Sequence, residues 1–242
     1  MSAFKLFAKR FYVKAVHGIG AALNRIGVLK WMEKHQDKRV FHWVRSLFAI
    51  YDIDQMIALD VPWWTYRAID QVDAFLTRRP AAKVFEFGSG ASTVWLARRA
   101  GTVHSVEHDQ PWFELMQSRI ADYPGITLVH VPADLTLGDD TLFHSEKEGY
   151  AGVSFEAYAK AIKRTDERYD VIVIDGRARP ACLSMASDCL TDGGIIVFDN
   201  TKRYRYDRAI VKSGLSVTAL PGITPSLPYS DKTTLLHVKA HG

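Results

Sequence analysis

Lys83-Val84-Phe85-Glu86-Phe87-Gly88-Ser89-Gly90-Ala91-Ser92-Thr93 reads as a short strand that runs into a glycine-containing turn. A helix is predicted to begin directly after it, at Val94. A Gly-x-Gly turn between a first strand and its helix lets the backbone approach a ligand closely, because side chains there would clash. The stretch therefore predicts the start of an α/β sheet with a ligand site at the turn.

The same alternation of strand and helix continues along the chain. Further strands are predicted at residues 102–106, 126–131, 169–174 and 195–198, with helices at 111–120 and 181–190. Such alternation, rich in Val and Ile, predicts a doubly wound, mostly parallel α/β sheet. Residues 215–220 and 234–238 have no helix between them, so we expect a C-terminal antiparallel hairpin.

Acidic residues stand at the ends of the predicted strands, where ligands of parallel sheets bind. Glu107 follows Gly88 by 19 residues, the spacing of an acid that accepts hydrogen bonds from ribose hydroxyls. Thr93 replaces the third glycine of a dinucleotide fingerprint, and Glu86 stands just before the turn. A carboxylate does not help a pyrophosphate but suits a cationic cofactor, which disfavours a dinucleotide.

The stretch Val84 to Gly90, the pair Val106-Glu107, the strand end at Asp175 and the final hairpin resemble class I S-adenosylmethionine-dependent methyltransferases. The resemblance covers roughly residues 62–240. It implies that Glu86 lies near the methionine portion of the cofactor, that Glu107 binds the ribose, and that Asp134 lies on the adenine side. The full set of expected cofactor contacts is Thr65, Glu86, Gly88, Ser89, Gly90, Ser92, Thr93, Glu107, His108, Asp134 and Asp175.

Within that family, Asp175 together with Asp199-Asn200 resembles the metal-dependent O-methyltransferases of the catechol and caffeoyl-CoA type. The resemblance implies that these three residues hold Mg²⁺ or another divalent cation and that Asp175 and Asp199 are catalytic. Adjacent strand ends lie about 5 Å apart, so two carboxylates there repel each other by roughly 3 kcal/mol. A bound cation would reverse that repulsion. Helix capping, or contact with cofactor and substrate without a metal, stays open.

The match to the metal-dependent enzymes is incomplete, because Ala178 stands where they carry a lysine. Arg177 and Arg179 flank it, and arginine is a poor base because it stays protonated. They are candidate contacts for an anionic substrate, with a solvated loop as the alternative. Trp64 is a further candidate substrate contact, although Trp63 and Trp64 could equally be core anchors.

Two polar stretches do not fit the repeat. Residues 136–160 form a long segment, and such segments are often functional lids or mobile insertions. His144 within it is a candidate base. Residues 202–206, Lys-Arg-Tyr-Arg-Tyr, place bases and aromatic rings near the expected active face, as an acidic or sugar substrate would need, or form a solvated charge run.

The N-terminal segment differs in charge from the rest of the chain. Residues 1–45 hold ten Lys or Arg and two acids, a net charge of +8, whereas the other residues have a net charge of −4. We expect a basic helical extension over residues 1–60 and the catalytic domain over 61–242. The first helix, with Phe4, Phe7 and Phe11 on one face, would pack on the domain or in a homodimer, contact an anionic membrane peripherally, or be frayed.

These patterns predict a cytoplasmic enzyme that methylates an oxygen of a small molecule or glycan, and association with a membrane stays open. The acidic main body does not suggest a nucleic-acid partner. Cys182 and Cys189 are expected to be reduced, and no apolar run reaches the length of a membrane span. An NAD-dependent oxidoreductase, with a parallel sixth strand, and a non-catalytic cofactor-binding scaffold are the alternatives.

Overall fold

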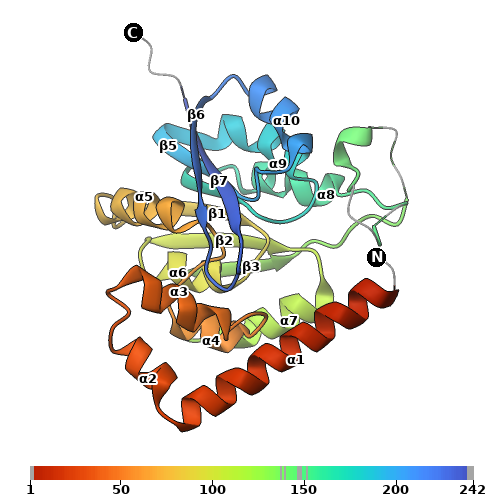
Figure 1. Cartoon of the computed structure of the whole chain (residues 1–242). Coiled ribbons are helices and arrows are strands. Elements are labelled where there is room, and N and C mark those ends of the chain that lie inside the picture. The colour runs from red at the N-terminus through yellow and green to blue at the C-terminus, as the bar shows by residue number, and fades with distance from the viewer. Residues whose placement is uncertain (1–2, 137, 139, 146–148, 151, 239–242) are drawn as a thin grey trace.

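The structure is a computed structural model that describes residues 3–136, 138, 140–145, 149–150 and 152–238, with side chains from residue 11 onward. Seven strands form one sheet in the order β3-β2-β1-β4-β5-β7-β6 (Figure 1). The strands are β1 (Lys83–Phe87), β2 (Thr102–Glu107), β3 (Ile126–His130), β4 (Tyr169–Ile174), β5 (Leu190–Phe198), β6 (Ser216–Ile223) and β7 (Ser230–His237). The first five are parallel, and β7 runs antiparallel to both β5 and β6.

The doubly wound sheet with a C-terminal hairpin is confirmed, and it is the fold expected for class I methyltransferases. The hairpin strands are longer than predicted. They extend into the Pro- and Gly-containing stretch after residue 220, where Pro221 and Gly222 still pair with Lys232 and Asp231. Because β6 is an edge strand, Pro221 needs no ladder partner on its outer side.

Helices cover both faces of the sheet (Figure 1). Strand residues alternate between the faces, so Phe85 and Phe87 pack with one set of helices and Val84 with the other. The first set is α8 (Glu156–Ala159), α9 (Arg179–Ala186) and α10 (Asp207–Lys212), and the second is α5 (Tyr66–Thr77), α6 (Ala91–Ala97) and α7 (Gln110–Arg119). Short 3₁₀ turns stand at Thr141–Phe143, Lys160–Thr165, Ser187–Cys189 and Tyr204–Tyr206.

The N-terminal region contains α1 (Ala3–Arg25), α2 (Val28–Glu33), α3 (Arg39–Leu47) and α4 (Ile53–Ala58). Turns at residues 34–37 separate α2 from α3. Helix α4 begins directly after the polar residue Asp52. Asp52 caps it by accepting a hydrogen bond from the Gln55 N–H, so the polar residue starts a helix there instead of ending one.

Residues of the N-terminal region pack against the sheet domain. The Trp43 indole donates to the Leu227 carbonyl, and the Ser226 N–H donates to the Ser46 hydroxyl. Asp60 bonds to both Arg98 and Arg99 at the end of α6. These contacts join the extension to the hairpin turn and to α6, and the proposed division at residue 60 stays a prediction.

Candidate active site

A cleft of about 1870 Å³ lies along the carboxyl ends of the parallel strands. It spans the point between β1 and β4 at which the strand order reverses, the usual ligand position in such sheets. Residues from the turns after β1, β2, β4 and β5 line it, together with residues 51–56 and part of the segment 140–150. The position of the cleft follows from the topology alone, whereas its chemistry depends on the turns.

The Gly88-Ser89-Gly90 turn forms the floor of the cleft. Gly88 has φ +96°, and a Cβ there would lie 2.9 Å from the Gly176 Cα, so neither the conformation nor the space admits a side chain. A Cβ on Gly90 would meet only the Ser92 hydroxyl, at 3.9 Å. Gly90 therefore faces open space in the cleft, where a ligand can approach the backbone.

Glu107 ends β2 and lies at the edge of the same turn. Its Oε2 accepts hydrogen bonds from the Ser89 N–H and hydroxyl, at 3.1 and 3.2 Å. Its Oε1 accepts from the N–H groups of His108 and Asp109, and the His108 Nδ1 lies 2.7 Å away. Burial opposes ionisation of Glu107, but His108 and the backbone donors outweigh it and lower the pKa. An ionised acceptor therefore faces the cleft beside the glycine turn.

Glu86 does not line the cleft, although the sequence suggested direct contact with the cofactor. Its side chain is fully buried on the α6 side of β1. It accepts hydrogen bonds from the hydroxyls of Ser92, Thr93 and Ser105. Burial, partly offset by these hydroxyls, raises the pKa of Glu86 to about 7.

Thr93 is likewise an internal residue and not a cofactor contact. Its hydroxyl accepts a hydrogen bond from the Gly90 N–H while donating to Glu86. The side chain is fully buried. Glu86 and Thr93 therefore fix the shape of the glycine turn from below. Of the predicted hydroxyl residues, Ser89 and Ser92 line the cleft.

The guanidinium of Arg179 lies between the ends of β4 and β5. Its Nη2 donates to the Asp175 carbonyl and to the Asp175 Oδ1, at 2.7 and 2.6 Å. Its Nη1 donates to the Asp199 carbonyl and its Nε to the Gly176 carbonyl. Arg179 thus places a positive charge of the chain itself beside the two strand-end acids. It also lines the cleft, but these four hydrogen bonds lie within the protein, which disfavours the predicted contact of Arg179 with a substrate.

The other expected metal ligands are also engaged within the protein. Asp199 is buried, does not line the cleft, and accepts a hydrogen bond from the Thr233 hydroxyl. Burial and the nearby Asp175 raise its pKa to about 8. The Asn200 amide donates to Asp231. In the described part of the chain no group of three acidic, His or Cys side chains converges as metal ligands do. The donor set therefore does not fit a divalent cation.

Three further predicted residues lie outside the cleft. Trp64 is fully buried and packs edge-on against Trp95 in the core. The Thr65 hydroxyl caps α5 and donates to the Leu220 carbonyl, so it has a structural role. Asp134 is exposed, and its backbone pairs with Ser154 away from the cleft lining.

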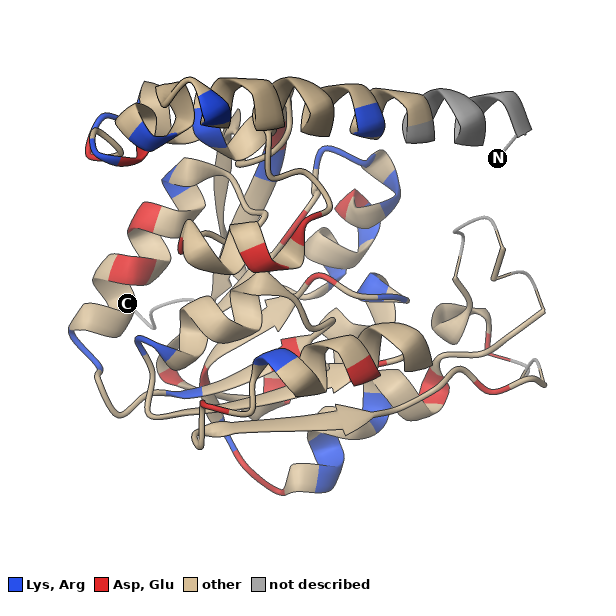
Figure 2. Cartoon of the chain, turned by 90° about the horizontal axis from the view of Figure 1, so that it is seen from below, with Lys and Arg blue, Asp and Glu red and all other residues tan. Residues whose placement is uncertain are grey.

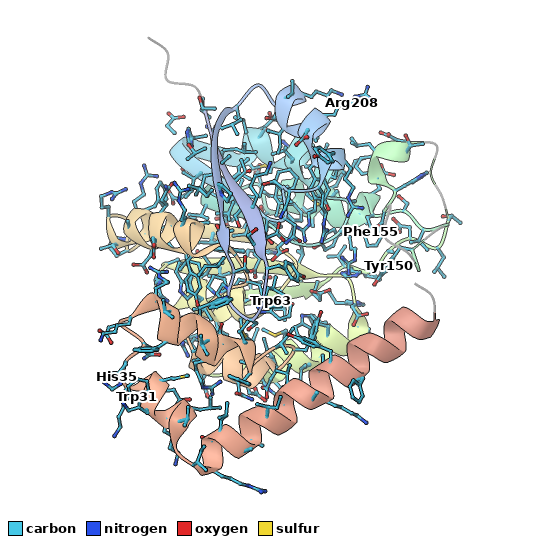
Figure 3. The ribbon with its side chains drawn as sticks, viewed as in Figure 1. Trp31, His35, Trp63, Tyr150, Phe155 and Arg208 are labelled. Atoms are coloured by element: carbon cyan, nitrogen blue, oxygen red, sulfur yellow. The ribbon has the colours of Figure 1, made fainter. Side chains whose placement is uncertain are left out.

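Several aromatic residues line the cleft that were not among the predicted site residues. Trp63 lines it in place of its neighbour Trp64, with Tyr51 edge-on at 5.5 Å between ring centroids. The Trp112 indole donates to the Ser89 carbonyl. In the lid segment, Tyr150 lies beside Phe155 (Figure 3), and its hydroxyl is 3.1 Å from the His108 Nε2. The sequence did offer a signal for Trp112, because it stands three residues after Asp109, which caps α7.

The segment 136–160 contributes to the cleft through the described residues Asp140, Thr141, Leu142, His144, Ser145 and Tyr150. The His144 Nε2 lies 3.1 Å from the Gly138 carbonyl. Asp139 and residues 146–148 lie outside the described residues. Part of the predicted lid thus borders the cleft, and its covering role stays a prediction.

Charge is divided across the cleft. Asp52, Glu107 and Asp109 line it on the β2 side, whereas basic residues that follow β4 and β5 line the opposite side. These basic residues are Arg177, Arg179, Arg203, Arg205, Arg208 and Lys212. Arg208 stands on α10 (Figure 3), and the Arg177 guanidinium lies 5.1 Å from the Tyr150 ring centroid. The two ends of the cleft therefore suit ligands of opposite charge.

No protein-family model matches the chain, and neither does any curated protein. Among solved structures, it is similar to a methyltransferase-like protein from Silicibacter pomeroyi, at 24% identity, 70% of this chain, 86% of that one and a TM-score of 0.47. It is also similar to an rRNA methylase from Streptococcus thermophilus, at 12% identity, 71% of this chain, 96% of that one and a TM-score of 0.48. The function has to be inferred from the cleft itself.

The raised pKa of Glu86 predicts a pH dependence of folding. The folded state holds the proton more tightly than the unfolded state, so the stabilisation is complete below the ordinary pKa of 4.5 and is lost as the pH rises through about 7. The loss is on the order of 3 kcal/mol. We expect Glu86→Gln to lose less stability than the wild type between pH 5 and 8 in urea unfolding. The exposed Glu114→Gln is the control, and equal slopes in wild type and Glu86→Gln would contradict the assignment.

The position of Arg179 predicts that its loss destabilises the fold. Arg179→Leu leaves a carboxylate and three carbonyls without their donors, which should cost at least about 3 kcal/mol of unfolding free energy. Arg208→Leu, on the exposed side of the same cleft, should cost less than about 0.5 kcal/mol. Mg²⁺ should leave the melting temperature of the wild type unchanged. A clear rise with Mg²⁺ would restore the metal hypothesis.

Proposed function

We propose that this chain is an S-adenosylmethionine-dependent methyltransferase. The observation that carries the proposal is the meeting of the Gly88-Ser89-Gly90 turn and the ionised Glu107 in one cleft at the strand-order switch. A carboxylate offers only acceptors and so suits ribose hydroxyls, and a turn with no side chain at Gly90 suits a closely packed ligand.

The residues on the β2 side fit a cationic nucleoside. Glu107 would bind the ribose through Oε2. The ribose hydroxyl would there replace the Ser89 hydroxyl, whose hydrogen bond to Oε2 is 3.2 Å long. Asp52 and Asp109 add negative charge near the same end. Trp63 and Tyr51 offer aromatic faces, which attract a cation such as a sulfonium. Glu86 and Thr93 support this cofactor site without touching the ligand.

A dinucleotide-dependent oxidoreductase is less well supported. That alternative predicted a parallel strand beyond β5, whereas β7 is antiparallel to β5. The carboxylates near the turn would also repel a pyrophosphate. Both observations favour a cationic, single-nucleoside cofactor.

For the acceptor we propose an anionic small molecule or glycan that is methylated on oxygen. The basic residues after β4 and β5 support this, since Arg177 lines the cleft and Arg208 lines it beyond β5, away from Glu107. Guanidinium groups bind carboxylates and phosphates through paired hydrogen bonds. Arg179 is excluded from this role because its donors are used inside the protein.

Asp175 is the residue best suited to accept the proton of an acceptor hydroxyl. It lines the cleft, and burial raises its pKa despite Arg179. Arg179 fixes the carboxylate through Oδ1. The cofactor, when bound, supplies an electrophilic methyl group, and the protein contributes mainly by holding the acceptor in line with it. Asp199 supports the hairpin and has no direct part in this scheme.

We further propose a cytoplasmic location. Cys182 and Cys189 are both free thiols and both buried, as is usual in a reducing compartment. Burial raises the pKa of Cys182, so its thiol stays protonated and unreactive. Neither cysteine lines the cleft.

Calorimetric titration with S-adenosylhomocysteine tests the cofactor. We expect binding of this ligand and none of NADH. Glu107→Ala removes charged hydrogen bonds to the ribose, each worth roughly 1.5–3 kcal/mol, so the Kd should rise at least tenfold. Glu114→Ala, an exposed acid on α7, should bind as the wild type does. Unchanged affinity of Glu107→Ala would remove the ribose assignment, and binding of NADH alone would overturn the proposal.

Methyl transfer from labelled S-adenosylmethionine into cell extracts tests the acceptor. We expect label in glycans and small molecules that anion-exchange resin retains. Arg208→Ala with Lys212→Ala, both cleft-lining residues of α10, should lower that incorporation at least tenfold while leaving S-adenosylhomocysteine affinity within twofold, because α10 follows β5, on the other side of the strand-order switch from Glu107. Arg78→Ala, an exposed arginine directly after α5, is the control. Label that ribonuclease removes would instead indicate an RNA acceptor.

A further inference from the structure

The outer face of α1 carries an exposed apolar stripe. Phe11, Ala15, Ile19, Ala22 and Ile26 follow one another at intervals of three or four residues, which puts them on one side of a helix. All five are exposed. The exposed fractions of the three large residues are 66% for Phe11, 55% for Ile19 and 73% for Ile26. Single exposed apolar residues are ordinary, but a continuous row along one helix marks an interaction surface.

The opposite face of α1 attaches the helix to the protein. The His17 Nε2 lies 2.9 Å from the Ile50 carbonyl. A Cβ on Gly20 would lie 3.2 Å from the Phe48 side chain, so the two elements are in close contact there. Figure 2 shows α1 as a straight rod along the outside of the molecule. The stripe therefore faces away from the sheet domain.

Basic residues accompany the stripe. Lys14 and Arg25 are exposed on α1, and Lys30 follows on α2. The sequence contains no Asp or Glu before Glu33. Trp31, on α2, is half exposed and packs against His35. This combination of an apolar face, flanking cations and a surface tryptophan is typical of helices that lie in a membrane interface.

A second copy of the chain is a poorer occupant of this face. Pairing stripe against stripe would bring Lys14 and Arg25 of two chains together, with no carboxylate in residues 1–32 to neutralise them. Like charges brought together at an interface are unfavourable. Anionic lipid headgroups provide the missing negative charge while the acyl region accepts the apolar side chains.

We propose that the outer face of α1 docks on an anionic lipid surface, with the helix parallel to the membrane plane. Among the described residues, no helix is both long and apolar enough to cross a bilayer. Docking by a helix lying in the interface is consistent with that finding. The proposal does not depend on the methyltransferase reaction.

Vesicle co-sedimentation of the full chain tests the docking. We expect binding to vesicles of phosphatidylcholine mixed with phosphatidylglycerol, little binding to phosphatidylcholine alone, and weaker binding at high salt. Ile19→Glu should reduce the partition coefficient at least tenfold. Lys14→Gln with Arg25→Gln should reduce it about 25-fold, at roughly fivefold per basic residue lost. Val211→Glu, at an 81% exposed position on α10, is the matched control and should bind as the wild type does.

Two results would overturn the proposal. One is a failure of the vesicle test: either the wild type does not bind, or Ile19→Glu binds as well as the wild type does. The other is a wild-type dimer in light scattering that Ile19→Glu converts to a monomer, which would assign the stripe to a second copy. Circular dichroism of each variant confirms that the exposed substitutions leave the fold intact.

Discussion

The buried guanidinium of Arg179 is the interaction on which the active cleft depends. Through four hydrogen bonds it joins the carboxyl end of β4 to that of β5. It pairs with the Asp175 carboxylate at the cleft and, through the Asp199 carbonyl, holds the two strand ends together. Because the planar guanidinium donates hydrogen bonds to several acceptors at once, this one side chain joins groups that a metal ion would otherwise join as its ligands.

The sequence was sufficient to predict the sheet, because its strands alternate with helices and end at glycines or acids. The glycine turn and Glu107 were found for the same reason. Trp64 is buried in the core whereas Trp63 lines the cleft, and the two stand before α5 in an irregular segment with no periodicity to show which side is the core. Arg179 was assigned to substrate although its spacing of four from Asp175 was a signal for an internal ion pair.

The charged residues of the chain are segregated between the cleft and α1. Acids gather beside the glycine turn and bases beyond β5, while the N-terminal excess of bases accompanies an apolar stripe. The net charge of +4 conceals all three regions. Local charge, read together with which side chains are internal, therefore says more about ligands than the total does. Glu86 is the clearest case, since its carboxyl lies next to the glycine turn and yet is hydrogen-bonded inside the protein.

The order of the hairpin strands has a consequence during synthesis. β7 follows β6 in the chain but lies between β5 and β6 in the sheet. β6 therefore has no place to pair until β7 has formed, and β5 keeps an open edge that includes Val197 and Phe198. An open, apolar strand edge attracts other chains. The nascent polypeptide therefore carries this open edge in the interval between the emergence of residue 198 and that of residue 237 from the ribosome.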